Sequence, residues 1–155
     1  MPKDTRPKAV VFDIDGTLAD YTHRAEHLVP PNRDMAVYFS KMGDDPPITA
    51  VVALLIEAYG NGYKVVLVTG RPEQYYKTTF RWLTSQNIPF DALFLRPRDD
   101  WRPGVDVRRD IYKTSIEPHY NVLYAADDNP KMITLWQELG VKSLMVGNGK
   151  LPETP

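Results

Sequence analysis

The sequence predicts an α/β protein, a doubly wound three-layer sandwich built on a central, mostly parallel sheet of five strands. Two observations support this prediction. Short apolar runs alternate with segments of helical length, and most of the runs end in acidic residues, threonine or glycine. Such alternation implies parallel strands joined by right-handed crossovers. The length of 155 residues fits one compact domain, residues 1–155, with a core over about 8–147 and ends that we expect to be flexible.

Five apolar runs are the expected strands. The first, residues 8–14, reads Lys-Ala-Val-Val-Phe-Asp-Ile and is rich in β-branched residues, which suits a strand buried on both faces. The other runs cover residues 64–68, 92–95, 121–126 and 142–146. Ligands of doubly wound sheets bind at the carboxyl ends of the strands. The polar residues expected at that edge are Asp13, Asp15, Thr69, Asp127 and Asp128.

Segments with helical patterns lie between these runs. We expect helices over residues 48–59, 72–86, 106–117 and 130–139. The first segment is apolar almost all round and should be deeply buried. The second begins with Pro72 at a favourable first helical position, and Asn129 caps the last one ahead of Pro130.

Two long stretches, residues 18–47 and 96–105, interrupt the alternation. Both contain prolines and many polar residues, both follow strand ends, and both should overhang the carboxyl edge of the sheet. We expect residues 18–47 to be largely free of helix and to leave room for only a minimal cap. The cleft should therefore be open to an extended ligand.

Composition and charge exclude several functions. The chain contains no cysteine, so disulfides, thiolate zinc sites and cysteine nucleophiles are excluded. The formal net charge of −1 gives no global attraction to nucleic acid, so a polyanion site would need a local basic patch. No apolar run is long enough to span a membrane and no signal peptide is evident, so we expect a cytoplasmic protein without a membrane partner.

The terminal Leu-Pro-Glu-Thr-Pro is interpreted as a frayed end. The absence of a Gly-x-x-x-x-Gly-Lys-Ser/Thr loop predicts no kinase domain in this chain.

The sequence Asp-Ile-Asp-Gly-Thr, which begins at Asp13, carries the chemical argument. Residues two apart in a strand point to the same face, so the carboxylates of Asp13 and Asp15 can converge at the strand end. One carboxylate can attack phosphorus, and the other can protonate the leaving oxygen and then deprotonate water. Gly16 permits a sharp turn that Thr17 helps to hold. An isolated Asp-x-Asp has an alternative interpretation without a catalytic role, in which a strand simply ends in two solvent-exposed acids.

This motif resembles the signature of the haloacid dehalogenase-like (HAD-like) phosphohydrolases, whose fold is a Rossmannoid sandwich. The resemblance implies that Asp13 is the nucleophile and Asp15 the general acid/base. Thr69, in a Thr-Gly-Arg run after the second strand, matches the second motif of the family and would hydrogen-bond the transferring phosphoryl group. Taken alone, Thr69 is equally typical of a helix N-cap.

Asp127 and Asp128 follow the fourth strand and indicate a Mg²⁺ site. Mg²⁺ binds a few carboxylates and keeps several waters. The expected ligands are Asp13, Asp127, Asp128 and the backbone carbonyl of Asp15. The ion would offset the repulsion between an anionic nucleophile and an anionic ester. The same acid pair also suits the start of a helix, because acids stabilise helix N-termini.

Over about residues 10–146 the chain resembles more closely the 3′-phosphatase domain of phage-type polynucleotide kinase-phosphatase. The resemblance implies that Arg24, Gly70 and Arg71 bind substrate. The two arginines would then form a fork that holds one phosphate.

The third motif departs from the pattern of that family, which usually has a lysine. Arg108 is the counterpart here, a substitution that keeps the charge and changes the donor geometry. Lys113 is the alternative, and Asp106 is the nearest candidate for the acidic residue of the motif.

These observations predict a Mg²⁺-dependent phosphomonoesterase that acts through an aspartyl phosphate on 3′-phosphate ends of nucleic acid, as in DNA or RNA repair, or on nucleotides. The loop that carries Arg96, Arg98, Trp101 and Arg102 would track phosphates and stack a base, or is a surface loop with Arg–Asp pairs. The alternatives are a small-metabolite or 5′-nucleotide phosphatase and a receiver-like signalling module. A receiver needs a long-lived phosphoaspartate, so the adjacent general acid argues against it.

Overall fold

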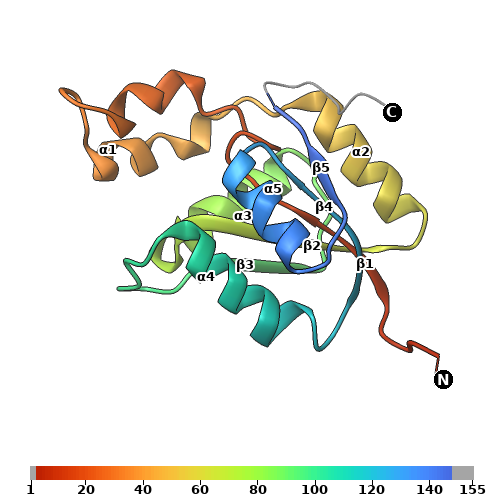
Figure 1. Ribbon diagram of the computed structural model, residues 1–155. Helices are drawn as coiled ribbons and strands as arrows, with labels where there is room; N and C mark the ends of the chain where they lie inside the picture. The colour runs from red at the N-terminus through yellow and green to blue at the C-terminus, as the bar shows by residue number, and fades with distance from the viewer. Residues whose placement is uncertain (1–2, 148–155) are drawn as a thin grey trace.

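The computed structural model describes residues 3–147 and contains a sheet of five parallel strands in the order β3-β2-β1-β4-β5 (Figure 1). The strands are β1 (Lys8–Phe12), β2 (Lys64–Pro72), β3 (Ala92–Arg96), β4 (Asn121–Asp127) and β5 (Ser143–Met145). Helices cover both faces, which confirms the predicted doubly wound sandwich. The strand order places the carboxyl end of β1 between those of β2 and β4.

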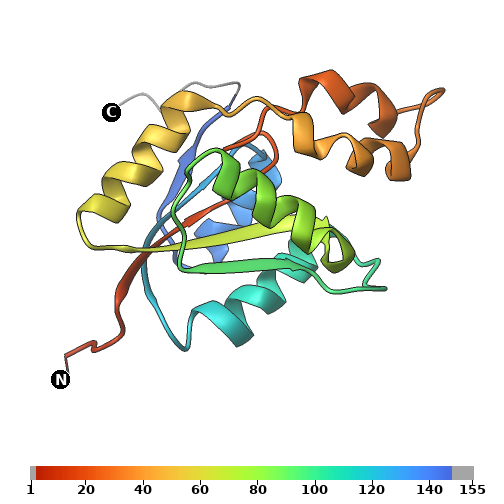
Figure 2. The same cartoon turned by 180° about the vertical axis from the view of Figure 1, so that it is seen from behind.

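Two helical layers enclose the sheet. The helices are α2 (Thr49–Gly60), η3 (Glu73–Tyr75), α3 (Tyr76–Ser85), α4 (Gly104–Ile111), its π-helical continuation η4 (Tyr112–Ile116) and α5 (Pro130–Glu138). α2 and α3 pack on one face, and α4, η4 and α5 pack on the other (Figures 1 and 2). Alternate residues of β1 divide between the two cores, with Val10 and Phe12 on the α2 side and Ala9 and Val11 on the α5 side. Both faces of β1 are therefore buried, as its unbroken apolar run predicts.

The second predicted helix begins later than its sequence suggests. β2 continues through Pro72, which pairs with Arg96 of β3 and has an extended backbone, with φ −63° and ψ 151°. The expected first helical residue is thus a strand residue, because the fixed φ of proline suits an extended backbone as well as a helix. No helix in the described part of the chain is long and apolar enough to cross a membrane.

Residues 18–47 form a small helical cap, which corrects the expectation that this stretch is largely free of helix. The cap contains η1 (Thr22–Leu28), α1 (Met35–Ser40) and η2 (Met42–Asp44). It projects from the carboxyl edge of the sheet (Figures 1 and 2). Backbone hydrogen bonds join its two ends: the Asp20 N–H donates to the Pro46 carbonyl, and the Ile48 N–H donates to the Leu18 carbonyl, both at 2.8 Å.

Local sequence features explain why the cap is helical. The carboxylate of Asp34 caps α1 by accepting the Val37 N–H at 3.2 Å. Tyr38 and Met42 of the cap are buried, whereas Val29 and Met35 are exposed. The expected flexible ends include residues 1–2 and 148–155, which lie outside the described residues.

Candidate active site

The glycine of the Asp-x-Asp-Gly-Thr motif lets the chain turn beside Asp128 where the paired strands β1 and β4 end. Asp13 follows the last residue of β1, and its N–H continues the ladder to the Ala126 carbonyl at 3.1 Å. The chain then turns at Gly16, where φ is +83°. A Cβ at Gly16 would overlap a carboxylate oxygen of Asp128, so another residue would displace that side chain as well as strain the turn.

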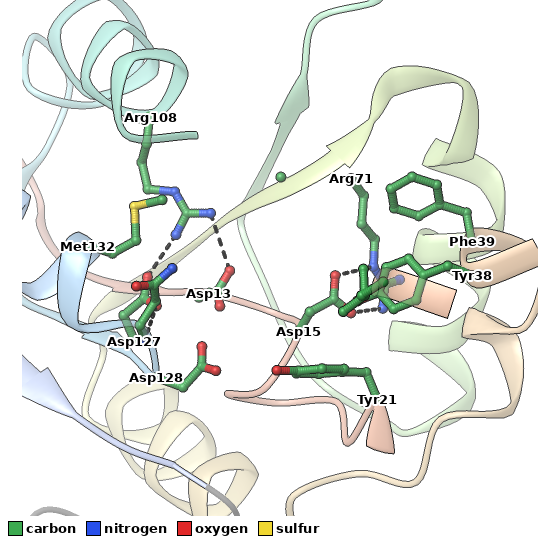
Figure 3. Close-up of a pocket in the computed structure, with 13 residues that line it drawn as sticks. Asp13, Asp15, Tyr21, Tyr38, Phe39, Arg71, Arg108, Asp127, Asp128 and Met132 are labelled. Atoms are coloured by element: carbon green, nitrogen blue, oxygen red, sulfur yellow. Dashed lines mark hydrogen bonds and ion pairs between the residues drawn. The ribbon is translucent and has the colours of Figure 1, made fainter. Parts of the chain in front are cut away.

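Asp13, Asp127 and Asp128 form an acidic cluster at the ends of β1 and β4 (Figure 3). One carboxylate oxygen from each residue lies within 4.8 Å of the others. Arg108 of α4 donates from Nη1 to Asp127 Oδ2 at 2.7 Å and from Nη2 to Asp13 Oδ1 at 3.3 Å. Thr17 Oγ1 lies 3.4 Å from both Asp13 Oδ2 and Asp128 Oδ1. Three carboxylates therefore face one guanidinium.

Burial and mutual repulsion disfavour the ionised forms of the acidic cluster. Desolvation raises the pKa of Asp13 to about 7, with a further contribution from the charge of Asp127, while Arg108 acts in the opposite direction. Desolvation also raises the pKa of Asp127 to about 6 and that of Asp128 to about 7. A bound divalent cation would add the missing positive charge. Converging carboxylate oxygens are ligands that Mg²⁺ accepts, so these three residues fit a metal site.

The Asp15 carboxylate lies in the same pocket but has two arginines as partners (Figure 3). Arg71 donates from Nη2 to Asp15 Oδ1 at 2.8 Å and from Nε to Oδ2 at 3.1 Å. Arg24 donates from Nη2 to Oδ1 at 2.6 Å. Burial opposes ionisation, yet the charges and hydrogen bonds of Arg71 and Arg24 outweigh it and lower the pKa of Asp15. The two carboxylates of one motif thus occupy opposite electrostatic environments.

Asp45 completes this arrangement, and the sequence analysis missed it. Its buried carboxylate accepts from Arg24 Nε at 2.8 Å and from Arg24 Nη2 at 2.6 Å, while Arg71 Nη2 lies 3.4 Å away. His23 Nε2 lies 2.6 Å from Asp45 Oδ1, and Trp82 Nε1 donates to the Asp45 carbonyl at 2.8 Å. The sequence indicates such a residue only indirectly. Two arginines expected in one cleft need a second carboxylate besides Asp15 to neutralise their charge.

The structure does not show the phosphate fork that was expected from Arg24 and Arg71. Both side chains are fully buried. Besides the bonds to Asp15 and Asp45, Arg24 Nη1 donates to the Tyr38 carbonyl at 3.4 Å and Arg71 Nη1 to Thr79 Oγ1 at 3.1 Å. Their donors are directed at protein acceptors, because two buried cations are stable only with such partners. In this geometry both guanidiniums hydrogen-bond the Asp15 carboxylate.

Thr69 lies near the end of β2 and is buried. Its hydroxyl accepts the Arg71 N–H at 3.1 Å. The alternative interpretation of Thr69 as a helix N-cap is wrong, since β2 continues to Pro72 and η3 follows without a side-chain cap. Gly70 lines the pocket beside Arg71.

Between the two candidates for the third motif, the structure brings only Arg108 into the site. Lys113 lies on η4 with half of its side chain exposed, and its Nζ is 3.7 Å from Glu117. Asp106, the candidate acid, pairs with Arg109 at 2.9 Å on the helix surface. Arg108 is buried against the acidic cluster.

The loop between β3 and α4 is ordered by its own arginines. Arg96 Nη1 donates to the carbonyls of Asp100 and Arg102 at 2.9 and 2.7 Å. Arg102 pairs with Asp100 at 2.9 Å and with Asp110 at 2.6 Å. The Arg–Asp pairing that defines the surface-loop alternative is therefore present for Arg102. Trp101 is 81% exposed at the loop surface.

Fold and site together define the class of protein. An Asp-x-Asp pair follows the central strand of a parallel sheet, an arginine reaches it from the helix after β3, and an acid pair follows β4. This arrangement defines a phosphatase with a haloacid dehalogenase-like fold. The family model for the phosphatase domain of polynucleotide kinase PNKP matches residues 7–151. The chain therefore belongs to that family, which confirms the resemblance seen in its motifs.

Known proteins and structures agree with this assignment. A protein of Autographa californica nuclear polyhedrosis virus, whose assigned name is that of a bifunctional polynucleotide kinase/RNA ligase, is 25% identical over 143 residues. The match covers 91% of this chain and 19% of the viral protein. A chain of the Pnkp1/Rnl/Hen1 complex is 30% identical with a TM-score of 0.82, over 96% of this chain and 49% of that one. The class C acid phosphatase from Bacillus anthracis shares the fold, with a TM-score of 0.68 and 16% identity over 93% of this chain and 67% of that one.

Proposed function

We propose that this chain is a Mg²⁺-dependent phosphomonoesterase that forms an aspartyl phosphate on Asp13 and acts on 3′-phosphate ends of nucleic acid or on 3′-nucleotides. The observation that carries the proposed chemistry is the separation of two roles within one motif. Asp13 lies in the acidic cluster, where a cation is needed, while Asp15 is held by Arg24 and Arg71 at the same pocket.

The reaction has two displacement steps at phosphorus. In the first, an Asp13 carboxylate oxygen bonds to phosphorus, the ester P–O bond breaks, and the leaving oxygen takes a proton from Asp15. In the second, water attacks the phosphorus of the aspartyl phosphate and gives a proton to Asp15. Inorganic phosphate leaves and the Asp13 carboxylate is restored.

The carboxylates of Asp13, Asp127 and Asp128 and the backbone carbonyl of Asp15 would hold Mg²⁺. When bound, the ion offsets the repulsion between the nucleophile and the phosphate ester. Arg108 orients Asp13 and Asp127 and adds positive charge beside the reacting group. Thr69 and Gly70 would contribute hydrogen bonds to the transferred phosphoryl group from the end of β2.

Asp15 must be protonated in the first step although its pKa is lowered in the free protein. A phosphate dianion held at Asp13 places negative charge near Asp15, and a like charge raises the pKa of a carboxyl group. Arg24 and Arg71 then favour the carboxylate that accepts the proton of water in the second step. The substrate itself would therefore move Asp15 between its two states.

The substrate class is supported by the family and by the size of the cap. Residues 18–47 cover only one side of the carboxyl edge, so a polymer end retains access (Figure 1). A small-metabolite or 5′-nucleotide phosphatase of the same superfamily is the second candidate, because the acidic cluster and Asp15 would serve any phosphomonoester. A receiver-like module is disfavoured by the placement of Asp15 in the pocket.

A substrate panel tests the proposal. We expect kcat/KM for a 3′-phosphorylated oligonucleotide or a 3′-nucleotide to exceed that for a 5′-nucleotide and a hexose phosphate at one ionic strength. The highest kcat/KM for the hexose phosphate would identify a small-metabolite phosphatase. The highest kcat/KM for the 5′-nucleotide would identify a nucleotidase. Hydrolysis of none of the four with Mg²⁺ present would remove the enzymatic proposal.

A further inference from the structure

The proposed chemistry determines which side of the pocket receives the leaving group. Asp13 bonds to phosphorus, and Asp15 protonates the leaving oxygen. The alcohol that departs must therefore lie on the side of Asp15, away from Arg108 and Asp127. Figure 3 shows this division, with Arg108, Asp127 and Asp128 on one side of Asp13 and Asp15 with Arg71 on the other.

The side that holds Asp15 is lined by aromatic residues of the cap. Tyr21, Tyr38 and Phe39 line the pocket there (Figure 3). Their rings form a continuous series: Tyr21 and Tyr38 have centroids 6.4 Å apart, Tyr38 and Phe39 5.2 Å apart, and Phe39 and Tyr75 of η3 4.8 Å apart. This aromatic wall connects the cap to the sheet domain.

Within the aromatic wall, the rings have different amounts of free surface. Tyr38 is buried, and the Arg24 guanidinium lies over its ring at 4.2 Å from the centroid. Tyr21 and Phe39 are half-buried and face the pocket, and Tyr75 supports Phe39. Phe39 and Tyr21 therefore have ring surface that a ligand can contact, while Tyr38 supports them.

The charges on this side favour a neutral leaving group. Two guanidiniums, of Arg24 and Arg71, face two carboxylates, of Asp15 and Asp45. The arginine donors already bond to protein acceptors, so no cation among these four residues remains for a second phosphate. A sugar bisphosphate or a nucleoside diphosphate would gain little here, whereas a nucleoside would meet an apolar, aromatic surface.

We infer that Phe39, with Tyr21 beside it, stacks against the base of the terminal nucleoside whose 3′-phosphate is hydrolysed. This inference rests on the proposed function, because it identifies the group that occupies the leaving-group side. A 3′-phosphate is the last group of its strand, so the leaving alcohol includes the terminal nucleoside and the rest of the polymer. This leaving group must lie beside the aromatic wall. Every base has a π face, so stacking gives affinity with little sequence preference.

The test compares two substrates that differ only in the base. One is a 3′-nucleotide and the other is the same pentose 3-phosphate without the base. In the wild type we expect the base to raise kcat/KM by about tenfold or more, the scale of stacking on one aromatic side chain. Phe39→Leu should remove most of this advantage, because kcat/KM should fall much more for the 3′-nucleotide than for the abasic substrate, which has no base to stack.

Matched variants separate stacking from loss of structure. Phe80→Leu removes a phenyl ring from the exposed side of α3 and should leave both substrates unchanged. Phe39→Trp should restore the advantage of the base, because it restores a stacking surface. Equal kcat/KM for the two substrates in the wild type overturns the inference, and that comparison needs no variant. If neither 3-phosphate is hydrolysed but another ester is, the proposed function itself has failed.

Discussion

The two halves of the pocket differ in their charge balance. The half formed by the ends of β1 and β4 contains three carboxylates and one guanidinium, and burial raises the pKa values of all three acids. The half beside the cap contains two carboxylates and two guanidiniums, and the pKa of Asp15 is lowered. One half therefore has an excess of carboxylates that could bind a cation, while the carboxylates of the other half are paired with arginines of the protein.

This difference separates two ways of using a carboxylate. A nucleophile must approach an anionic ester, so a site that binds a cation is an advantage there. A general acid/base must instead keep its position while it gains and loses a proton. In the proposed mechanism, Arg24, Arg71 and Asp45 would supply that position, because they link Asp15 to the cap and to β2.

Asp13→Asn should have the largest effect on turnover. The amide keeps the shape of the side chain but cannot form the acyl phosphate, so we expect phosphate release to fall by at least about 10³-fold. The unfolding temperature in a chelator should not decrease, because one of three crowded carboxylates is removed. Turnover within tenfold of the wild type would contradict the assignment of Asp13.

Arg71→Ala should lower kcat by about 10²-fold, the usual contribution of a positioned general acid. Because Arg71 acts through Asp15, the loss should be similar for a 3′-nucleotide and a hexose phosphate, with a smaller change in KM. Arg109→Ala, which removes a surface arginine paired with Asp106, is the control and should remain within about twofold. A loss confined to the KM for the 3′-nucleotide would instead support the phosphate fork.

Asp45→Asn and Asp128→Asn compare the stability of the two halves directly. Loss of the Asp45 charge leaves Arg24 and Arg71 with one buried carboxylate, and we expect the free energy of unfolding to fall by about 3 kcal/mol. Asp128→Asn relieves repulsion in the acidic cluster and should leave stability unchanged or slightly raised. Urea unfolding of both variants in a chelator measures the difference. Equal destabilisation would show that the halves do not differ in charge balance.

With a chelator present, the pH dependence of the free energy of unfolding should reflect the raised pKa values of the acidic cluster. The pKa of Asp13 rises from 3.8 to about 7 on folding, so the folded state binds more protons between these values. Stability should therefore fall as the pH rises through this window, by at most about 4 kcal/mol, and Mg²⁺ should restore it at pH 7.5. Asp15, whose pKa is lowered, acts in the opposite direction and only on the acid side. Asp13→Asn should flatten the profile, and an unchanged slope would contradict this origin.

Lys113→Ala should have the smallest effect on turnover. Its half-exposed side chain pairs with Glu117, and such surface pairs contribute about 0–1 kcal/mol. We expect turnover within about twofold of the wild type, whereas Arg108→Ala, which frees the Asp13 and Asp127 carboxylates, should lose about 10²-fold. A large loss in Lys113→Ala would make Lys113 the basic residue of the third motif.

The sequence by itself determined the sheet and the position of the acids. The unbroken apolar runs of β1 and β2 reflect burial on both faces, and such runs are visible directly in the sequence. The motif at Asp13 and the acid pair after β4 follow strand ends, and parallel strands bring their carboxyl ends to one edge. The positive φ of Gly16 is likewise a local feature of the turn, whereas its close contact with Asp128 is made only in the folded structure.

Only the tertiary structure decided how Arg24 and Arg71 are used. Their shared partner, Asp45, lies 21 and 26 residues away along the chain, and no local pattern connects the three. A buried guanidinium can be neutralised by a carboxylate of the protein or by the phosphate of a substrate, and residue type alone does not separate these cases. The cap helices decide it, because they carry Arg24 and bring Asp45 beside both arginines. The long-range pairing of buried charges thus gives both arginines carboxylate partners within the protein, while their part in binding phosphate stays a prediction that Arg71→Ala tests.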